Sequence, residues 1–480
     1  MPDRPNIVII MPDQLRADSM SCAGHPIVQT PNIDRIAAEG MRFANAYTTC
    51  PICMPARSSV LSGVYCHNHG QWTNIGRMHP STDTYPHHAK AAGYHTAHIG
   101  KSHLYPHKQD QHLDADKPFM HRLGWDDVLE TTGPWATVTT DSIMTDRWKQ
   151  LGCLDTFRND YKRRREAGGT KALWRSPMPE GEHLDAFIGK TAVEYLAGYN
   201  RAEPLLAFVG FGGPHEPWDP PADWAARYDP AAMDASKPPV QPGPWVPEPA
   251  ASHQRRMQND SLKITPEING SIRALYYAKI SHVDWWIGRI IEALASRGML
   301  DNTAIILWSD HGEMLCDKGR LHKGVFYEES VHVPLIVRPP TVGAHGVCPA
   351  GPGSVCERPA SLVDIFPTIL ELAGCEPKAK AFGRSLMPLL ADPQAPHHDA
   401  VFSEINNRTM VRDERLKMVL DSNGDVLKLY DMQDDPREEA NLAGRNDVET
   451  IVAELRDRVL QWLLATQVRQ AADEYESCVH

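Results

Sequence analysis

The stretch "NIVIIMPDQ", residues 6–14, joins an apolar run directly to two polar residues, Asp13 and Gln14. A near-continuous apolar run of this length is typical of a strand that is buried on both faces of a parallel sheet. Open sheets of this kind bind their ligands outside the carboxyl ends of the strands. The stretch therefore predicts a central strand whose end presents Asp13 and Gln14 to a ligand.

Three later segments repeat this arrangement of a strand-like run followed by polar residues. Helix-like stretches lie between the runs, at 32–40, 185–199 and 272–297. This alternation predicts an α/β fold in which a large, mostly parallel sheet is sandwiched by helices, with the polar groups at one edge. The three segments are 94–100 before Lys101 and His103, 204–211 before His215, and 303–309 before Asp310 and His311.

The length of the chain indicates more than one domain. It has 480 residues, of which 42% are hydrophobic, enough for one large core and a smaller one. We expect a catalytic domain over 1–374 and a small C-terminal α+β domain over 375–480. The second domain is predicted to contain strands near 400–405, 408–413 and 416–420, and a helix over 448–466.

Charge and cysteine content narrow the class of protein. The formal net charge is −12, with 61 acidic against 49 basic residues, which argues against a nucleic-acid partner. Neither a signal peptide nor a membrane-spanning run is visible. The ten cysteines are irregularly spaced, so a disulfide framework is not expected. These features predict a cytoplasmic protein.

Two overlapping cysteine patterns occupy residues 48–63, "TTCPICMPARSSVLSG". Cys50 and Cys53 form a C-x-x-C pair that suggests a redox dithiol, whereas Cys53, Pro55 and Arg57 form C-x-P-x-R. Pro55 and the glycine that ends the stretch place Cys53 at a helix N-terminus, which favours a developing anion. The dithiol alternative gives no role to Arg57, so we expect Cys50 to be an ordinary buried thiol.

The C-x-P-x-R stretch resembles the signature of the type I sulfatases of the alkaline phosphatase superfamily. In that family a maturation enzyme converts the cysteine to Cα-formylglycine. Further segments resemble the family in its own order along nearly the whole chain: "RPNIVIIMPDQLRAD", "TPNIDRIAAEGMRFANAY", "GYHTAHIGKSHL", "GGPHEPWDPPADW", "SDHGEMLCDKGRLHKGVFYEESVHVPLIV" and "KLYDMQDDPREEANLA".

The resemblance implies a complete set of site residues. One divalent metal would be held by Asp13, Gln14, Asp310 and His311, together with an oxygen of the modified Cys53. The remaining roles fall on five more residues: Arg57 orients the hydrated aldehyde, Lys101 and Lys323 clamp the sulfate oxygens, His215 lies near the leaving-group oxygen, and His103 takes a proton when the covalent intermediate breaks down.

These residue types suit the hydrolysis of a sulfate monoester. Such an ester is already anionic, and a metal with two lysines offsets the repulsion of a nucleophile. One hydroxyl of the formylglycine hydrate attacks sulfur as a metal-bound alkoxide. The other, deprotonated by His103, expels sulfate as the carbonyl forms again. We expect a small-molecule substrate, aryl sulfates first, a formylglycine-generating maturation enzyme as partner, and a homo-oligomer.

Two departures from the commonest family pattern leave the metal open. Gln14 and His311 stand where many sulfatases have Asp and Asn, which makes the site less typical of Ca²⁺ and admits Mn²⁺. The same pairs resemble the phosphonate monoester hydrolase and phosphodiesterase branch, the main competing function. Lys101 and His103 favour a sulfatase, because that branch has neutral hydroxyl groups there. A choline sulfatase is a less favoured alternative, and a non-catalytic relic is disfavoured because every expected charged partner of Cys53 is present.

Two segments, 105–182 and 219–249, are interpreted as insertions over the ligand edge of the sheet. The second is too rich in proline for regular structure. Long ordered loops in this position commonly shape a substrate pocket. Four tryptophans are candidates for an aromatic wall there, with a core or oligomer role left open for each: Trp135, Trp174, Trp218 and Trp245.

Overall fold

A computed structural model describes residues 4–169, 172–238, 264–342, 353–376 and 381–467. Its centre is a sheet of eight strands in the order β5-β4-β6-β1-β7-β8-β2-β9. All neighbouring strands are parallel except at β8, which is antiparallel to β7 and to β2. The strands are β1 (Asn6–Asp13), β2 (Met41–Phe43), β4 (His95–Lys101), β5 (Asp127–Thr131), β6 (Leu205–Pro214), β7 (Thr303–Trp308), β8 (Leu335–Arg338) and β9 (Ser354–Cys356).

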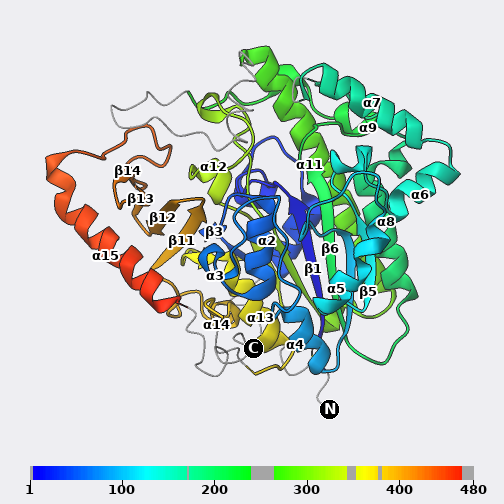
Figure 1. The fold of residues 1–480 in the computed structure, drawn as a ribbon, viewed down its shortest axis with the longest axis horizontal. Helices are drawn as coiled ribbons and strands as arrows, with labels where there is room; N and C mark the ends of the chain where they lie inside the picture. The colour runs from blue at the N-terminus through cyan, green and yellow to red at the C-terminus, as the bar shows by residue number, and fades with distance from the viewer. Residues whose placement is uncertain (1–3, 170–171, 239–263, 343–352, 377–380, 468–480) are drawn as a thin grey trace, which may run out of the picture.

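Strand β1 is buried on both faces, as its apolar run predicts. Val8 and Ile10 belong to one apolar cluster, whereas Ile7, Ile9 and Met11 belong to another on the opposite face. The first cluster includes residues of α1 (Pro31–Glu39), α8 (Leu184–Gly198) and α11 (Pro266–Ser296), and the second includes residues of α2 (Cys53–Ser62), α4 (Tyr85–Ala91), α5 (Lys117–Arg122) and α13 (Ile365–Leu372). The sheet is therefore sandwiched by helices, and the predicted fold class is confirmed (Figure 1).

The smaller C-terminal part contains an antiparallel sheet and a helix. Strands β11 (Ala400–Ile405), β12 (Arg408–Asp413), β13 (Leu416–Asp421) and β14 (Val426–Asp431) pair in sequence order. Helix α15 (Glu449–Ala465) packs on this sheet, with Trp462 stacked on Phe402 at a ring-centroid distance of 4.5 Å. The sequence predicted three of the strands and the helix but missed β14. The boundary at residue 374 stays a prediction.

The segment 105–182 is more than an insertion, which corrects the sequence interpretation. It contributes β5 to the central sheet, paired in parallel with β4. Helices α5, α6 (Ile143–Gln150) and α7 (Leu154–Glu166) also fall in it. The alternating pattern of β5, "DVLET", is too polar to stand out, because this strand lies at the edge of the sheet.

The proline-rich segment also contains regular structure. The short helix α9 (Ala222–Ala225) and a 3₁₀ turn at Pro230–Ala232 lie in its described part, and residues 239–249 lie outside the described residues. Trp218 is 1% exposed and belongs to the core, whereas Trp135 packs on Tyr161 and Trp174 donates a hydrogen bond to Asp160. Trp245 lies outside the described residues.

The remaining described elements are short. Strands β3 (Ala46–Tyr47) and β10 (Ala360–Ser361) form a separate parallel pair. Within the described ranges, no helix combines the length and the apolar character that crossing a membrane requires. The other α-helices are α3 (Cys66–His69), α12 (Glu328–Val331) and α14 (Met387–Ala391).

Candidate active site

The ends of four neighbouring strands supply most of the site. Asp13 is the last residue of β1 and Lys101 the last of β4, while His215 directly follows β6 and Asp310 comes two residues after β7. These strands are adjacent in the order β4-β6-β1-β7, so their carboxyl ends share one edge. The predicted gathering of polar groups at this edge is what the structure shows.

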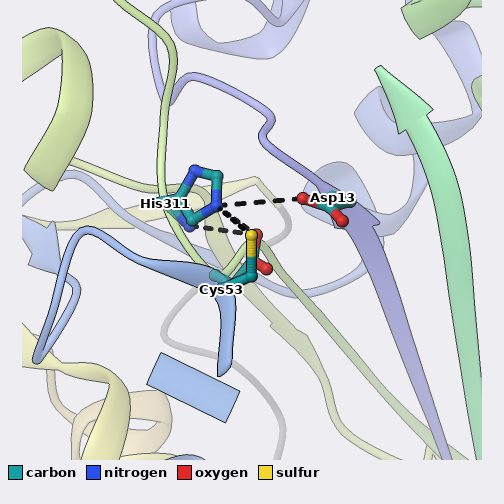
Figure 2. Close-up of side chains that lie close together, drawn as sticks. Asp13, Cys53 and His311 are labelled. Atoms are coloured by element: carbon teal, nitrogen blue, oxygen red, sulfur yellow. Dashed lines mark hydrogen bonds and ion pairs between the residues drawn. The ribbon is translucent and has the colours of Figure 1, made fainter. Parts of the chain in front are cut away.

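Cys53 is the first residue of α2, as its sequence context predicts. Its side chain is buried, and Sγ lies 2.9 Å from Nε2 of His311 (Figure 2). Burial raises the pKa of the thiol, but Lys323 and His311 outweigh burial and hold this pKa well below its usual value.

Asp13, Cys53, Asp310 and His311 form a buried group that can hold a metal ion. One ligand atom from each lies within 4.8 Å of the others. Asp13 Oδ1 is buried and has no hydrogen-bond partner among the described residues, while His311 Nε2 lies 3.9 Å from it (Figure 2). Burial lowers the pKa of His311, yet Asp310 raises it overall to about 9. This negative field and the unpartnered oxygen fit a divalent cation.

Arg57 connects the strand ends to one another. Its Nε donates to Asp310 Oδ2 at 2.8 Å, and Nη2 pairs with Asp13 Oδ2 at 2.9 Å. Nη1 donates to the backbone oxygens of Lys101 and Ser102 at 3.0 and 3.1 Å. The guanidinium, 3% exposed, therefore fixes both carboxylates and the end of β4. Its predicted contact with the nucleophile itself stays a proposal.

Two lysines contact the residues of this site. Lys101 Nζ forms an ion pair with Asp13, and Lys323 Nζ donates to the side-chain oxygen of Gln14. Lys323 Nζ also lies 2.9 Å from Nε2 of His215. The Gln14 amide oxygen is thus turned toward Lys323, and the backbone N–H of Gln14 donates to Asp310 Oδ1 at 3.1 Å.

His103 completes the predicted set beside the thiol. It follows β4 with φ at 53°, in the left-handed region that non-glycine residues rarely adopt. Desolvation lowers the pKa of its ring, although the hydrogen bond with Cys53 opposes this shift. The ring is therefore neutral near pH 7 and able to accept a proton.

Sequence reasoning missed two buried carboxylates in the site. Gln14 Nε2 donates to Glu216 Oε2 at 3.0 Å and to Glu313. Lys323 Nζ lies 3.9 Å from Glu216, whose pKa is raised by burial but held well below its usual value by His215, Lys323 and His322. Their positions directly after His215 and two residues after His311 were the available signal.

Comparisons with known proteins identify the family of the chain. The sulfatase family model matches residues 5–375, and the model of the N-sulphoglucosamine sulphohydrolase C-terminal region matches 316–464. The chain is 28% identical to an arylsulfatase of Clostridium perfringens, covering 96% of this chain and 94% of the relative. It is 27% identical to a multifunctional alkaline phosphatase superfamily protein of Trinickia caryophylli, covering 96% of each.

Solved structures show the same fold. The phosphonate monoester hydrolase of Agrobacterium radiobacter superposes with a TM-score of 0.76 at 25% identity, covering 97% of this chain and 96% of that one. A structure of BT4656 with D-glucosamine-2-N,6-O-disulfate superposes with a TM-score of 0.72 at 24% identity, covering 97% of each chain. The family match over more than three quarters of the sequence, together with the site at the sheet edge, shows that this chain belongs to the sulfatase family.

Proposed function

We propose that the protein hydrolyses sulfate monoesters, aryl sulfates first, with a formylglycine made from Cys53 as the nucleophile. The observation that carries this proposal is the position of Cys53. It lies at the N-terminus of α2, within one buried group with Asp13, Asp310 and His311. Anionic chemistry is favoured there, because helix N–H groups and cationic side chains surround the nucleophile.

The chain's own residues fit one divalent metal ion, Ca²⁺ or Mn²⁺. Asp13, Asp310 and His311 would hold it with the side chain of residue 53, and Gln14 is a further candidate ligand. When bound, such an ion lowers the pKa of a nucleophilic hydroxyl and stabilises negative oxygens. Arg57 keeps both carboxylates oriented through the ion pairs that it makes with them.

The first chemical step transfers the sulfuryl group to the enzyme. One hydroxyl of the formylglycine hydrate, having already lost its proton, attacks sulfur, the bond from sulfur to the ester oxygen breaks, and the alcohol or phenol leaves. Lys101 and Lys323 hold the non-bridging oxygens, and His215 lies near the leaving oxygen, where it supplies a proton. Placing the reacting groups in one rigid site removes much of the entropic barrier.

The second step releases sulfate without another attack at sulfur. His103 takes the proton of the remaining hydroxyl, the aldehyde carbonyl forms, and the bond between carbon and the sulfate oxygen breaks. Water then hydrates the aldehyde. A neutral His103 is required here, which agrees with the desolvation that lowers its pKa.

A second candidate function is phosphonate monoester hydrolysis. It is favoured by the Gln14 and His311 positions and by the 25% identical phosphonate monoester hydrolase structure. The two functions are separated by measuring kcat/KM for an aryl sulfate, choline sulfate, a sugar sulfate and a phenyl phosphonate ester on one metal-analysed preparation. We expect the aryl sulfate to be preferred. A kcat/KM for choline sulfate clearly above that for the aryl sulfate contradicts the aryl assignment.

Substitutions at Lys101 and His103 sharpen this comparison. Lys101→Ala should lower kcat/KM, whereas His103→Ala should slow release of sulfate and leave a burst of phenol. Both should damage aryl sulfate hydrolysis more than phosphonate ester hydrolysis. A wild type that prefers the phosphonate ester by orders of magnitude, with both variants nearly unaffected, would assign the enzyme to the phosphonate branch.

The proposal extends to the setting of the enzyme. A formylglycine-generating enzyme must act on Cys53, and intact-mass measurement tests this because the aldehyde is lighter than the thiol. A cytoplasmic location and a homo-oligomeric assembly belong to the same proposal. Cell fractionation and light scattering check them separately.

A further inference from the structure

The ring of His103 stacks on His107 at a centroid distance of 5.9 Å and lies beside Cys53. Its Nδ1 is buried but has no hydrogen-bond partner among the described residues. The left-handed φ of 53° is nevertheless unfavourable for a residue with a side chain, so neighbouring contacts must maintain it.

Glu130 holds the chain on both sides of His103. It lies on β5, where it pairs in register with Gly100 of β4. Ser102, the residue before His103, donates its hydroxyl to Glu130 Oε1, and Tyr105, two residues after His103, donates its hydroxyl to Oε2. All three side chains are at most 3% exposed. One carboxylate thus spans the residues that flank the strained position.

A second support acts on the same segment from the other side. Arg57 Nη1 holds the backbone oxygens of Lys101 and Ser102, and the N–H of Met78 donates to the backbone oxygen of Leu104 at 3.2 Å. These contacts hold backbone atoms of the segment, whereas Glu130 binds the side chains of Ser102 and Tyr105. The carboxylate therefore joins the two residues on either side of the turn at His103.

We propose that Glu130 is a positioning residue that holds His103 in the geometry needed to release sulfate from the enzyme. Glu130 does not touch the nucleophile and acts through Ser102 and Tyr105. This inference rests on the proposed function only for the step that it assigns to His103. The contacts of Glu130 with Ser102 and Tyr105 do not depend on that assignment.

The pKa of Glu130 distinguishes a positioning role of its carboxylate from a contribution to the stability of the fold. Burial raises its pKa to about 7, Asp116 adds to the shift, and the hydrogen bonds from Ser102 and Tyr105 oppose it. Asp116 is itself paired with Arg77 at 3.1 Å. Because the folded-state pKa exceeds the unfolded value, ionisation of Glu130 lowers stability as pH rises from about 4.5 to 7. A neutral replacement should therefore not destabilise the fold at pH 8.

The test compares Glu130→Gln with Asp284→Asn. Asp284 is a buried carboxyl on α11 whose pKa burial likewise raises, to about 6, and it accepts hydrogen bonds from the Asn32 side chain and the backbone N–H of Ile33. For Glu130→Gln we expect kcat with an aryl sulfate to fall about 10- to 100-fold. KM should fall in parallel, because only the second step slows, so that kcat/KM stays within about threefold and a burst of phenol appears.

Measurements of stability and a conservative variant serve as controls for the kinetic test. The urea midpoint of Glu130→Gln at pH 8 should equal or exceed that of the wild type, and Glu130→Asp should recover part of kcat. Asp284→Asn should leave both kcat and KM unchanged. Loss of stability in step with activity, or unchanged kcat in Glu130→Gln, overturns the positioning role.

A second readout does not depend on turnover. In protein labelled at histidine, the NMR signal of His103, assigned by its loss in His103→Ala, should shift or broaden in Glu130→Gln and stay in place in Asp284→Asn. An unchanged signal overturns the inference. If the wild type hydrolyses no sulfate ester, the proposed function fails, and this measurement alone decides whether Glu130 positions His103.

Discussion

Two buried groups of charges in this molecule have opposite designs. The active-site cluster, Asp13, Arg57, Lys101 and Asp310, lies where the strands of the large sheet end. The second group, called the junction cluster, links the catalytic part to the C-terminal sheet. It consists of Tyr47, Glu328, Lys417 and Glu438.

The junction cluster satisfies its charges internally. Lys417 Nζ lies 2.7 Å from Glu328 and 2.6 Å from Glu438, and Tyr47 donates its hydroxyl to Glu328 at 2.9 Å. Among the described residues neither Asp13 Oδ1 nor Glu438 Oε1 makes a hydrogen bond, but Glu438 Oε1 lies 2.6 Å from Lys417 Nζ, whereas Asp13 Oδ1 lies 3.9 Å from His311 Nε2, with the Cys53 thiol beside it. Buried charges that pair with one another hold two parts of a protein together, whereas a buried charge without a close partner can bind a ligand.

The largest expected effect is at the nucleophile. Cys53→Ala should lower turnover about a thousandfold or more, because the alanine side chain cannot form the hydrate that attacks sulfur. Cys50→Ala is the matched control, since Cys50 is also a buried free thiol, and it should keep turnover within a few-fold. Aryl sulfate assays on both variants check this, and equal loss in both would restore the dithiol interpretation.

Next in size is removal of the metal. Exhaustive chelation should abolish turnover, and Asp310→Asn should weaken metal retention on the order of 100-fold, because a carboxylate supplies much of the local negative charge. Elemental analysis after dialysis measures retention without an activity assay. Full activity in a verified metal-free sample would contradict the open design of the active-site cluster.

The junction cluster should respond in stability instead. Lys417→Met leaves the buried Glu438 and the partly buried Glu328 without their cation and should cost about 3–5 kcal/mol of unfolding free energy. Urea unfolding measures this cost, and turnover per folded molecule should change less than a few-fold. Adding Glu328→Gln and Glu438→Gln should restore part of the loss. If Lys417→Met instead impairs turnover of the folded enzyme at full stability, the two clusters are not distinct in role.

The smallest effect is expected at Tyr47. Tyr47→Phe removes one hydrogen bond to a carboxylate and should cost about 1.5 kcal/mol. The same urea measurement detects it, and kinetic constants should not move. A change in KM would show that the junction communicates with the substrate site.

Much of the fold follows from local patterns in the chain. The apolar run of β1 and the Pro55–Gly63 spacing around α2 predicted a central strand and a helix that begins at Cys53, as observed. Strands β2, β5, β8, β9 and β14 were not predicted; β5, β9 and β14 lie at sheet edges, where a strand carries a mixed pattern that resembles a loop.

The site, like the fold, could be predicted from the sequence only in part. The polar residues at the strand ends could be predicted from the sequence, because each directly follows a strand-like apolar run. The family resemblance then implied their roles. The contacts of Glu130, Glu216 and Glu313 were not readable, since their partners lie elsewhere along the chain. A buried carboxylate has no periodic signal of its own.

By itself, the sequence determined the alternation of strands and helices, the family and the candidate nucleophile, because periodicity and motif spacing are properties of neighbouring residues. Only the tertiary structure decided which charges meet. It brought Arg57 between Asp13 and Asp310, turned Gln14 toward Lys323 and placed Glu130 behind His103. These contacts form only when strands distant in sequence align at one edge, and burial there makes each pairing costly to leave unmade.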